Sequence, residues 1–249
     1  MKSHSGYGES AKRFKPSLLL LVAMTVLLGA CQTIKQICYT YDPLNFHAVD
    51  EGVLYRSAQP TGGDLEMIVQ KYGIKSVINL RGANPGQNWY DNEVIVSEQY
   101  GLKRVDISMS AGSIPHKPDL VSLHNAFRDL PRPMLVHCKA GADRTGEAAA
   151  IFALDYMKLQ KWEASRQLHP YFGHVPDLCP AKTYFFNKVY QGETWARESY
   201  DPCHGDYEYY DKVAFCGVPP APVPKGVSPA PPPPPPSPAK VKRRIDDER

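Results

Sequence analysis

The sequence lacks three features that would each point to a different class of protein. Its N-terminal apolar run, residues 18–30, has 13 residues and is too short to span a bilayer. Lys and Arg total 29 against 26 for Asp and Glu, so no sustained basic surface indicates nucleic acid. No Cys or His cluster has metal-ligand spacing, and the stretch from His169 to His174 is typical of a Pro/Gly loop. We therefore expect no metal, no other cofactor and no nucleic-acid partner.

The apolar run has the surroundings of an export signal. Four basic residues precede it, and it ends with Leu28-Gly29-Ala30-Cys31. This ending resembles the lipobox of bacterial lipoproteins, in which a signal peptidase cuts before a cysteine that becomes lipidated. The resemblance implies a signal peptide over residues 1–30 and a lipid on Cys31. That lipid would hold the protein on a membrane of the bacterial cell envelope, on a periplasmic or other extracytoplasmic face. The alternative is an ordinary signal peptide followed by a chance cysteine.

Two of the six cysteines, Cys31 and Cys138, have roles suggested by their flanking residues. The other four are Cys38, Cys179, Cys203 and Cys216. An exported protein can pair such cysteines in disulfides. Cys203 and Cys216 flank a Tyr-rich segment and are the most plausible pair, and the alternative is four free, partly buried thiols.

Composition divides the rest of the chain into a tether, one domain and a tail. Residues 31–45 are predicted as the tether, 46–198 as the domain, and 199–249 as a Tyr- and Cys-containing segment with a disordered tail. The tail holds six consecutive prolines, Pro231 to Pro236, which favour polyproline II and cannot pack into a core. Such a tail is a spacer or a ligand for another protein, and the spacer is the simpler expectation.

Short apolar strands alternate with amphipathic helices over residues 52–197. Strands are predicted at 52–57, 76–80, 103–107 and 133–136, and helices at 64–72, 89–100, 119–130, from 145, 161–168 and 181–197. Asp64 and Asp119 are predicted as N-caps of two of these helices. The alternation predicts an α/β fold with a mainly parallel sheet of four to five strands flanked by helices. Ligands of such sheets bind beyond the carboxyl ends of the strands.

A loop with the chemistry of a phosphate-ester site follows the last predicted strand. It reads His137, Cys138, Lys139, Ala140, Gly141, Ala142, Asp143, Arg144, Thr145 and Gly146. Because it leads into a helix, backbone N–H groups from Lys139 to Arg144 are expected to surround a phosphate, and the helix dipole adds positive charge. The same field favours the nucleophilic thiolate of Cys138, while the planar group of Arg144 grips two phosphoryl oxygens. Thr145 is expected to donate a hydrogen bond to the sulfur, and His137 to orient the loop from behind.

This loop resembles the signature of the cysteine-dependent protein tyrosine and dual-specificity phosphatases. That signature is His-Cys, five residues, Arg, Ser/Thr and Gly, and every fixed position matches. The resemblance covers about residues 52–197 and implies the cysteine-dependent phosphatase fold and hydrolysis through a phosphocysteine. Rhodanese-like sulfurtransferases also carry a cysteine on such a loop, but their loops differ in length and lack the Arg-Thr-Gly ending. A chance loop with a structural cysteine is the remaining alternative.

Cleavage of a phosphate monoester leaves an alkoxide or phenoxide, so a general acid is expected near the thiol. Asp106 is the first candidate, because it ends a strand where dual-specificity phosphatases carry their acid loop. Asp143 is the rival, because Asp-Arg-Thr resembles myotubularins, Sac-type phosphatases and some bacterial phosphatases, in which this Asp acts as the acid. We expect Asp106, since a separate loop reaches the leaving oxygen more easily. Arg56 and Arg81 are expected to be surface or ion-pair arginines, with substrate binding as the alternative.

The resemblance is to the compact dual-specificity domain, which implies a shallow pocket and a phosphorylated protein or another phosphoester as substrate. We expect a protein tyrosine or dual-specificity phosphatase. A phosphoinositide or small-molecule phosphatase is the alternative that Lys139 and Asp143 support, although the five variable positions carry net charge zero and an inositol headgroup would prefer a more basic rim. A non-catalytic phospholigand-binding envelope lipoprotein is the other alternative, which the retained Cys138 and Arg144 disfavour.

Overall fold

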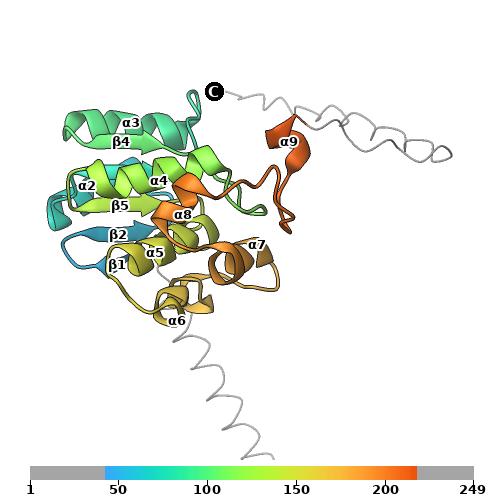
Figure 1. Cartoon of the computed structure of the whole chain (residues 1–249). Coiled ribbons are helices and arrows are strands. Elements are labelled where there is room, and N and C mark those ends of the chain that lie inside the picture. The colour runs from blue at the N-terminus through green and yellow to red at the C-terminus, as the bar shows by residue number, and fades with distance from the viewer. Residues whose placement is uncertain (1–42, 218–249) are drawn as a thin grey trace, which may run out of the picture. The chain divides into compact units, whose positions relative to one another are not determined.

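The central sheet is built from strands of four residues each. In the computed structural model, which describes residues 43–217, these are β1 (His47–Asp50), β2 (Leu54–Ser57), β3 (Ser76–Asn79), β4 (Lys103–Asp106) and β5 (Met134–His137). The strand order is β1-β2-β5-β3-β4, with β1 antiparallel to β2 and the other pairs parallel (Figure 1). The predicted sheet is confirmed, and β1 is an addition that the sequence did not reveal. Its half-exposed residues at the edge of the sheet leave no apolar alternation to read.

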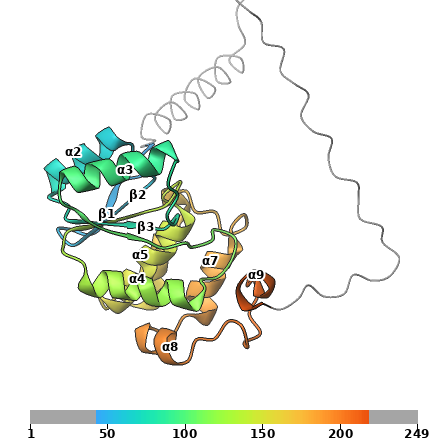
Figure 2. The same ribbon diagram turned by 90° about the horizontal axis from the view of Figure 1, so that it is seen from above.

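Helices cover both faces of the sheet, as parallel strands require for their crossovers. They are α2 (Gly62–Tyr72), α3 (Asn88–Gln99), α4 (Lys117–Asp129), α5 (Asp143–Asp155), α6 (Lys161–Ala164), α7 (Pro180–Tyr184), α8 (Glu193–Glu198) and α9 (Lys212–Cys216), with 3-10 turns η1 (Ser165–Gln167) and η2 (Pro170–Phe172) and a π-helical turn η3 (Phe185–Val189). Figure 2 shows α2 and α3 on one face and α4, α5 and α7 on the other.

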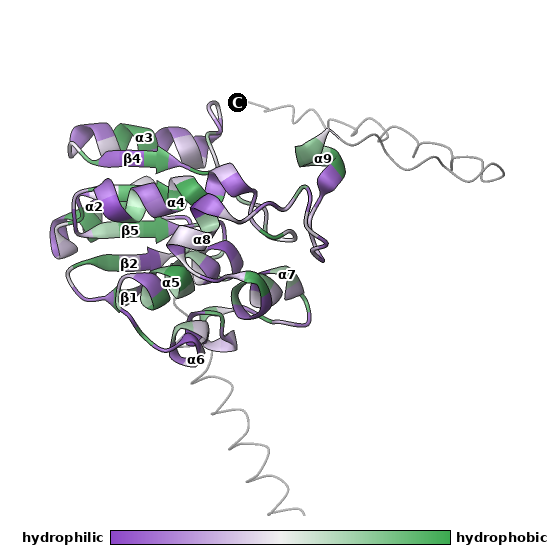
Figure 3. Ribbon diagram, viewed as in Figure 1, coloured by the Kyte–Doolittle hydropathy of each residue, from purple (hydrophilic) through white to green (hydrophobic). Residues whose placement is uncertain are grey.

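The two faces bury separate apolar cores. Neighbouring strand residues such as Leu135 and Val136 point to opposite faces, so Leu135 joins the core under α2 and α3, and Val136 joins the larger core under α4 and α5. Figure 3 shows hydrophobic residues along β2, β5 and α5. The larger core also contains Cys138, which places the predicted nucleophile at its edge.

Two helix starts differ from the prediction. Thr61 is the N-cap of α2, with Asp64 at the third helical position: each side chain accepts a hydrogen bond from the other's backbone N–H, at 3.2 and 3.0 Å. Helix α4 follows His116, so Asp119 lies in its first turn. The N-cap predictions for Asp64 and Asp119 are therefore wrong. Acidic residues suit both the cap and the first turn, because both lie at the positive end of the helix dipole.

The predicted helix at 181–197 is interrupted. Helix α7 continues into the π-helical turn η3, Tyr190 then has extended backbone angles, and α8 begins only after Gly192. Gly192 has a φ of 105°, a conformation that side-chain-bearing residues rarely adopt. The break turns the chain so that Tyr190 and Tyr200 both lie buried in the larger core.

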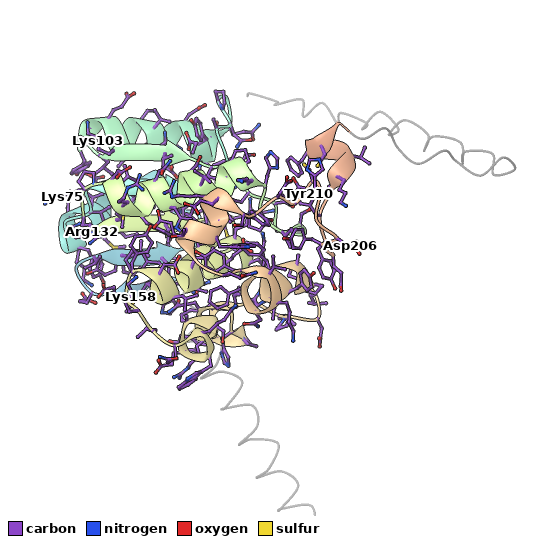
Figure 4. The ribbon with its side chains drawn as sticks, viewed as in Figure 1. Lys75, Lys103, Arg132, Lys158, Asp206 and Tyr210 are labelled. Atoms are coloured by element: carbon purple, nitrogen blue, oxygen red, sulfur yellow. The ribbon has the colours of Figure 1, made fainter. Side chains whose placement is uncertain are left out.

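The domain extends beyond its predicted end at residue 198. The chain divides into one unit that ends at Asp211 and another that begins at Lys212, of which the described part is α9. Within the first unit, Tyr200 is fully buried and Tyr207 and Tyr210 pack against the larger core. Figure 4 shows Tyr210 on the side of the molecule toward which the strands point, opposite Lys103.

The signal peptide, Cys31, Cys38, most of the tether and the Pro-rich tail lie outside the described residues. Cys203 and Cys216 are each disulfide-bonded, and their pairing with each other stays a prediction. Cys138 and Cys179 carry free thiols. No helix within residues 43–217 has the length and apolar character needed to cross a membrane, and no group of three or more His, Cys, Asp or Glu side chains in that range could hold a metal ion.

Candidate functional site

The signature loop joins the carboxyl end of β5 to the amino end of α5. Cys138 directly follows β5 and is 3% exposed, and α5 begins at Asp143. Three consecutive loop carbonyls accept hydrogen bonds from outside the loop: Lys139 O from Gln59 N at 3.2 Å, Ala140 O from Asn45 Nδ2 at 3.1 Å and Gly141 O from Arg56 Nη2 at 2.7 Å. Because these carbonyls are turned outward, the N–H groups of the loop are available to donate hydrogen bonds to an anion beside Cys138.

Gly141 lets the loop approach β2 more closely than any other residue would. Its φ is +68°, and a Cβ atom there would lie 2.6 Å from Ala58 N and 2.7 Å from the Ser57 carbonyl carbon. Both contacts are to backbone, which cannot move aside without shifting the sheet. The end of β2 therefore fixes the loop from one side, and the loop tolerates only glycine at this position.

Arg56 is buried beneath the loop, so the expectation of a surface or ion-pair arginine is wrong. Its Nη1 donates to the main-chain and side-chain oxygens of Gln167 at 2.9 and 2.7 Å, and its guanidinium lies 4.1 Å from the centre of the Phe172 ring. Burial lowers the pKa of Arg56 to about 10, although the negative charge of Cys138 opposes this shift. A buried positive charge near Cys138 favours the thiolate.

Arg144 lies in the first turn of α5 with one edge of its guanidinium held and another available. Nη1 donates to the carbonyls of Leu80 and Met109, both at 3.3 Å, which follow β3 and β4. Nε is buried and has no hydrogen-bond partner among residues 43–217. The edge formed by Nε and Nη2 is thus suited to bind two oxygens of a phosphoryl group.

Thr145 is placed as predicted but does not make the predicted bond. The residue is fully buried at the start of α5, and its hydroxyl has no hydrogen-bond partner, sulfur included, among the described residues. The expected hydrogen bond from Thr145 to Cys138 is therefore not present in this structure. A buried hydroxyl without a partner carries a free-energy cost, which a bound oxyanion or a rotated thiolate would relieve.

His137 is the last residue of β5 and is fully buried beside Glu93, and its role in orienting the loop stays a prediction. Its Nε2 is 3.0 Å from Oε2 of Glu93 on α3, and both side chains are fully buried. Gln59 and Arg104 also donate to the Glu93 carboxylate, at 2.7 and 2.9 Å. Burial alone would raise the pKa of Glu93, but His137, Gln59 and Arg104 together lower it to about 2. Glu93 is thus a fixed negative charge beside His137, whose two ring nitrogens make no hydrogen bond among the described residues.

Asp106 continues this network on β4. Its carboxylate accepts from Asn79 Nδ2 and Tyr90 OH, both at 2.8 Å, and from Arg104 Nη2 at 3.1 Å. Asp106, Asn79 and His137 are register partners on adjacent parallel strands, so their side chains share the face of α2 and α3. Both oxygens of the predicted acid already accept hydrogen bonds from neighbouring side chains. This geometry does not support Asp106 as a proton donor.

Asp143, the rival carboxylate, is held by a second chain of polar groups, of which His174 is fully buried. His174 Nδ1 lies 2.7 Å from Asp143 Oδ1, and His174 Nε2 lies 2.8 Å from the Thr183 hydroxyl. Burial raises the pKa of Asp143, but the hydrogen bond and charge of His174, with a hydrogen bond from Cys179, bring it below its ordinary value. Asp143 is therefore a carboxylate at neutral pH, fixed beside Arg144.

Arg81 lies at the rim of the site rather than on a remote surface. It directly follows Leu80, whose carbonyl contacts Arg144. Its Nη1 donates to Gln59 Oε1 at 2.9 Å, and its guanidinium lies 3.3 Å from the centre of the Trp89 ring. Burial and the charge of Arg144 lower the pKa of Arg81, and the charge of Cys138 opposes this shift. Arg81 thus adds a further positive charge near the nucleophile, besides Arg56 and Arg144.

Glu93, His174 and the buried Lys182 are supporting residues that the sequence analysis missed. A signal exists for Glu93, because it falls with Val96 and Ser97 on the buried stripe of α3, where a carboxylate needs a partner. His174 and Lys182 gave no such signal. Their partners, Asp143 and Glu147, precede them by more than 30 residues, and only the tertiary fold brings them together.

Sequence comparison relates the chain to known phosphatases. A family model described as DSP-PTPase phosphatase fused to NAD+ kinase matches residues 38–169, which is more than half of the chain. OCA1 of Mycosarcoma maydis, a protein named as a putative tyrosine-protein phosphatase, is 31% identical over 132 residues, which cover 52% of this chain and 78% of OCA1.

The chain is also similar to solved structures. The Siw14 catalytic core matches with a TM-score of 0.50 at 18% identity, covering 63% of this chain and 90% of that one. TpbA of P. aeruginosa, in complex with pTyr, matches with a TM-score of 0.48 at 22% identity, covering 64% of this chain and 91% of that one. At 18% identity, the similarity to Siw14 supports the fold alone. The family model and OCA1 carry the assignment further: this chain belongs to the DSP-type PTPase family, and it is a phosphatase.

Proposed function

We propose that this phosphatase cleaves phosphotyrosine and related aryl phosphomonoesters through a phosphocysteine on Cys138. The observation that carries the proposal is the loop itself. Its carbonyls at 139–141 are turned outward, its nucleophile is nearly buried, and Arg144 presents an unpartnered Nε beside it. These groups suit a tetrahedral dianion.

In the first step, the Cys138 sulfur attacks phosphorus opposite the ester oxygen. The S–P bond forms as the P–O bond to the substrate breaks, and the bonding electron pair leaves with the substrate oxygen. Arg144 and the loop N–H groups stabilise the charge on the three remaining phosphoryl oxygens. Arg56 lowers the cost of keeping the sulfur ionised before attack.

In the second step, Asp143 acts as the general base. Water attacks phosphorus, its proton passes to the Asp143 carboxylate, and the S–P bond breaks to return the thiolate. Three observations support this role: Asp143 is adjacent to Arg144, its side chain is 23% exposed, and its lowered pKa keeps it ionised at neutral pH. His174 fixes its orientation.

The hydrogen bonds that Asp106 and Asp143 already make favour substrates with an acidic leaving group. Asp106 accepts three hydrogen bonds, and Asp143, whose pKa is lowered, is bonded to His174, so neither carboxyl is placed to give a proton to the leaving oxygen. A leaving group that departs with little help from an acid is then favoured. A tyrosine phenol, with a pKa of about 10, leaves more readily than the much less acidic alcohol of serine or threonine.

Arg81 favours a second candidate, a polyphosphorylated small molecule such as a phosphoinositide. The loop alone is too weakly basic for such a ligand, but Arg81 adds a cation beside Arg144, and Lys139 is exposed on the loop. Two cations at this rim suit a second phosphate. Comparing Arg81→Gln with the wild type separates the two candidates, because only turnover of a polyphosphate should depend strongly on Arg81.

The test is turnover by the purified protein on phosphotyrosine peptides, phosphoserine peptides and soluble phosphoinositides, with Cys138→Ser as the inactive control. We expect phosphotyrosine to be turned over at least about tenfold faster than phosphoserine, about 1.4 kcal/mol of barrier, and acid quenching during turnover to trap phosphate on Cys138. A non-catalytic phospholigand binder would show no turnover of any substrate, which would refute the proposal. Faster turnover of phosphoserine than of phosphotyrosine would refute the leaving-group argument alone.

We also propose that Cys31 carries the lipid that the lipobox resemblance implies, which would place the domain on an extracytoplasmic membrane face of a bacterial envelope. The short apolar run and the small residues before Cys31 support this. Mass spectrometry of membrane-extracted protein should find an acylated N-terminal cysteine. An intact Met1 without lipid would refute it.

A further inference from the structure

The loop between β4 and α4, residues 107–116, is held at four consecutive residues by the C-terminal part of the domain. Ser113 O accepts from Lys182 Nζ at 2.7 Å, Ile114 N donates to Tyr209 O at 2.8 Å, Pro115 O accepts from Tyr200 OH at 2.6 Å, and His116 Nδ1 lies 2.6 Å from Tyr210 OH. Every partner follows its loop residue by at least 69 residues in the sequence. Each contact is therefore a product of the tertiary fold.

Lys182 is the most constrained of these partners. It is fully buried, and its ammonium group also lies 2.9 Å from Oε2 of the fully buried Glu147, which follows Arg144 on α5. Burial raises the pKa of Glu147 to about 7, although Lys182 opposes the shift. Two buried charges are costly unless their geometry is fixed. Lys182 thus connects the helix that carries Arg144 to the 107–116 loop.

Tyr200 holds a second carbonyl of the loop. Its side chain is fully buried in the larger core, and its hydroxyl donates to Pro115 O. Tyr209 and Tyr210 add contacts from residues 199–211, the C-terminal segment, which lies beyond the region that the family model matches. The position of the loop therefore depends on a segment outside the matched region.

The loop in turn contacts Arg144 through Met109. The Met109 carbonyl is one of two acceptors of Arg144 Nη1, and Ile107, Met109 and Ile114 anchor the loop in the core. We propose that Lys182 and Tyr200 are positioning residues of the active site, which hold the 107–116 loop so that Met109 O fixes the Arg144 guanidinium for the phosphoryl group. This inference rests on the proposed role of Arg144.

The 107–116 loop affects the orientation of the Arg144 guanidinium and leaves its charge unchanged. Nη1 is shared between Leu80 O and Met109 O at 3.3 Å, so each of the two bonds is long. A small shift of the loop would remove one acceptor and let the guanidinium rotate. Arg144 would keep its charge but lose the fixed geometry that makes two simultaneous bonds to phosphate favourable. Phosphate affinity and turnover should then fall together.

Tyr200→Phe is the sharpest test, because it removes one hydroxyl and leaves the packing intact. Tyr156→Phe is the control: its hydroxyl lies within hydrogen-bond distance of His124 O, Glu193 Oε2 and His124 Nδ1, and it makes no hydrogen bond to the 107–116 loop. We expect Tyr200→Phe to lower kcat/KM for an aryl phosphate about tenfold, about 1.4 kcal/mol of barrier, and to raise the inhibition constant of inorganic phosphate several-fold. Tyr156→Phe should lower the melting temperature comparably but leave both kinetic quantities within about twofold.

A second variant tests Lys182 without leaving Glu147 buried and unpaired. Lys182→Met combined with Glu147→Leu removes both charges at once, a change that proteins often tolerate in stability. Ser113 O then loses its donor, so we expect weaker phosphate inhibition and lower kcat/KM even if the melting temperature is retained. Wild-type activity in a stably folded double variant would overturn the role of Lys182.

Arg144→Lys separates this inference from the proposed function. If Arg144→Lys leaves phosphate inhibition unchanged, the proposed role of Arg144 fails. If Arg144→Lys abolishes phosphate inhibition while Tyr200→Phe behaves like Tyr156→Phe, only the positioning inference fails.

Discussion

Replacement of Asp106 by asparagine tests how far the structure changes the expectation drawn from sequence. As a general acid, Asp106 would matter only as far as the leaving oxygen needs a proton. As part of the network seen here, it is an acceptor for Asn79, Tyr90 and Arg104. The two roles predict different dependence on the leaving group, and the structure favours the second.

The magnitude follows from the contacts. Asparagine keeps one acceptor oxygen but loses the negative charge that Arg104 contacts at 3.1 Å. Its NH₂ group would also face one of the groups that now donate to Asp106. A hydrogen bond between charged groups contributes about 1.5–3 kcal/mol, so we expect Asp106→Asn to lower the free energy of unfolding by about 2 kcal/mol. The effect on catalysis passes through Arg104 and Glu93 to His137, and we expect a loss of about tenfold or less, about 1.4 kcal/mol of barrier.

The assay compares kcat/KM for a phosphotyrosine peptide with kcat/KM for an aryl phosphate whose phenol has a low pKa. We expect Asp106→Asn to lower both by the same factor, so that their ratio stays constant. Because both substrates are measured on the same preparation, any loss of folded protein cancels in that ratio. A selective loss of about a hundredfold on the peptide, about 2.7 kcal/mol, with the activated substrate spared, would restore Asp106 as the acid and refute this reasoning.

The remaining predictions concern the supports of the loop. Asp143→Asn should slow hydrolysis of the phosphocysteine more than its formation, so rapid-quench kinetics should show a larger burst of phenol release than in the wild type; an unchanged burst with an unchanged rate of phosphocysteine hydrolysis would contradict the base role. Gly141→Ala should abolish turnover, because its Cβ would lie 2.6 Å from Ala58 N, and retained activity would show that β2 can move. The ionised Glu93 carboxylate stabilises the fold by roughly 3 kcal/mol at pH values above its ordinary pKa of 4.5, and this stabilisation should be lost as the pH falls toward 2. Glu93→Gln should remove this part of the pH dependence of the free energy of unfolding, measured with denaturant. An unchanged pH dependence in Glu93→Gln would argue against the network. Cys179→Ser should keep turnover within about tenfold, since serine can still donate to Asp143, and complete inactivation of a folded variant would reveal a redox role.

Several elements could be predicted because they depend on local sequence pattern. Short apolar runs and a helical stripe are properties of neighbouring residues, so β3, β5 and the buried face of α2 could be read directly. The order of Cys138, Arg144 and Thr145 between a strand and a helix also indicated the chemistry, because the backbone of such a loop turns its N–H groups toward a common centre once its carbonyls are held.

The residues that support this loop could not be predicted, because long-range contacts of the folded chain bring them there. Arg56 reads as an ordinary charged residue in a strand, yet it is buried against Gly141, because β2 and β5 are neighbours in the sheet although they are far apart in the chain. Asp106 reads as an acid at a strand end, yet the register of three parallel strands turns it toward Asn79. Long-range pairing of polar groups leaves no periodic mark in a sequence. Burial then makes each pairing obligatory, because a polar group without a partner is costly inside the fold.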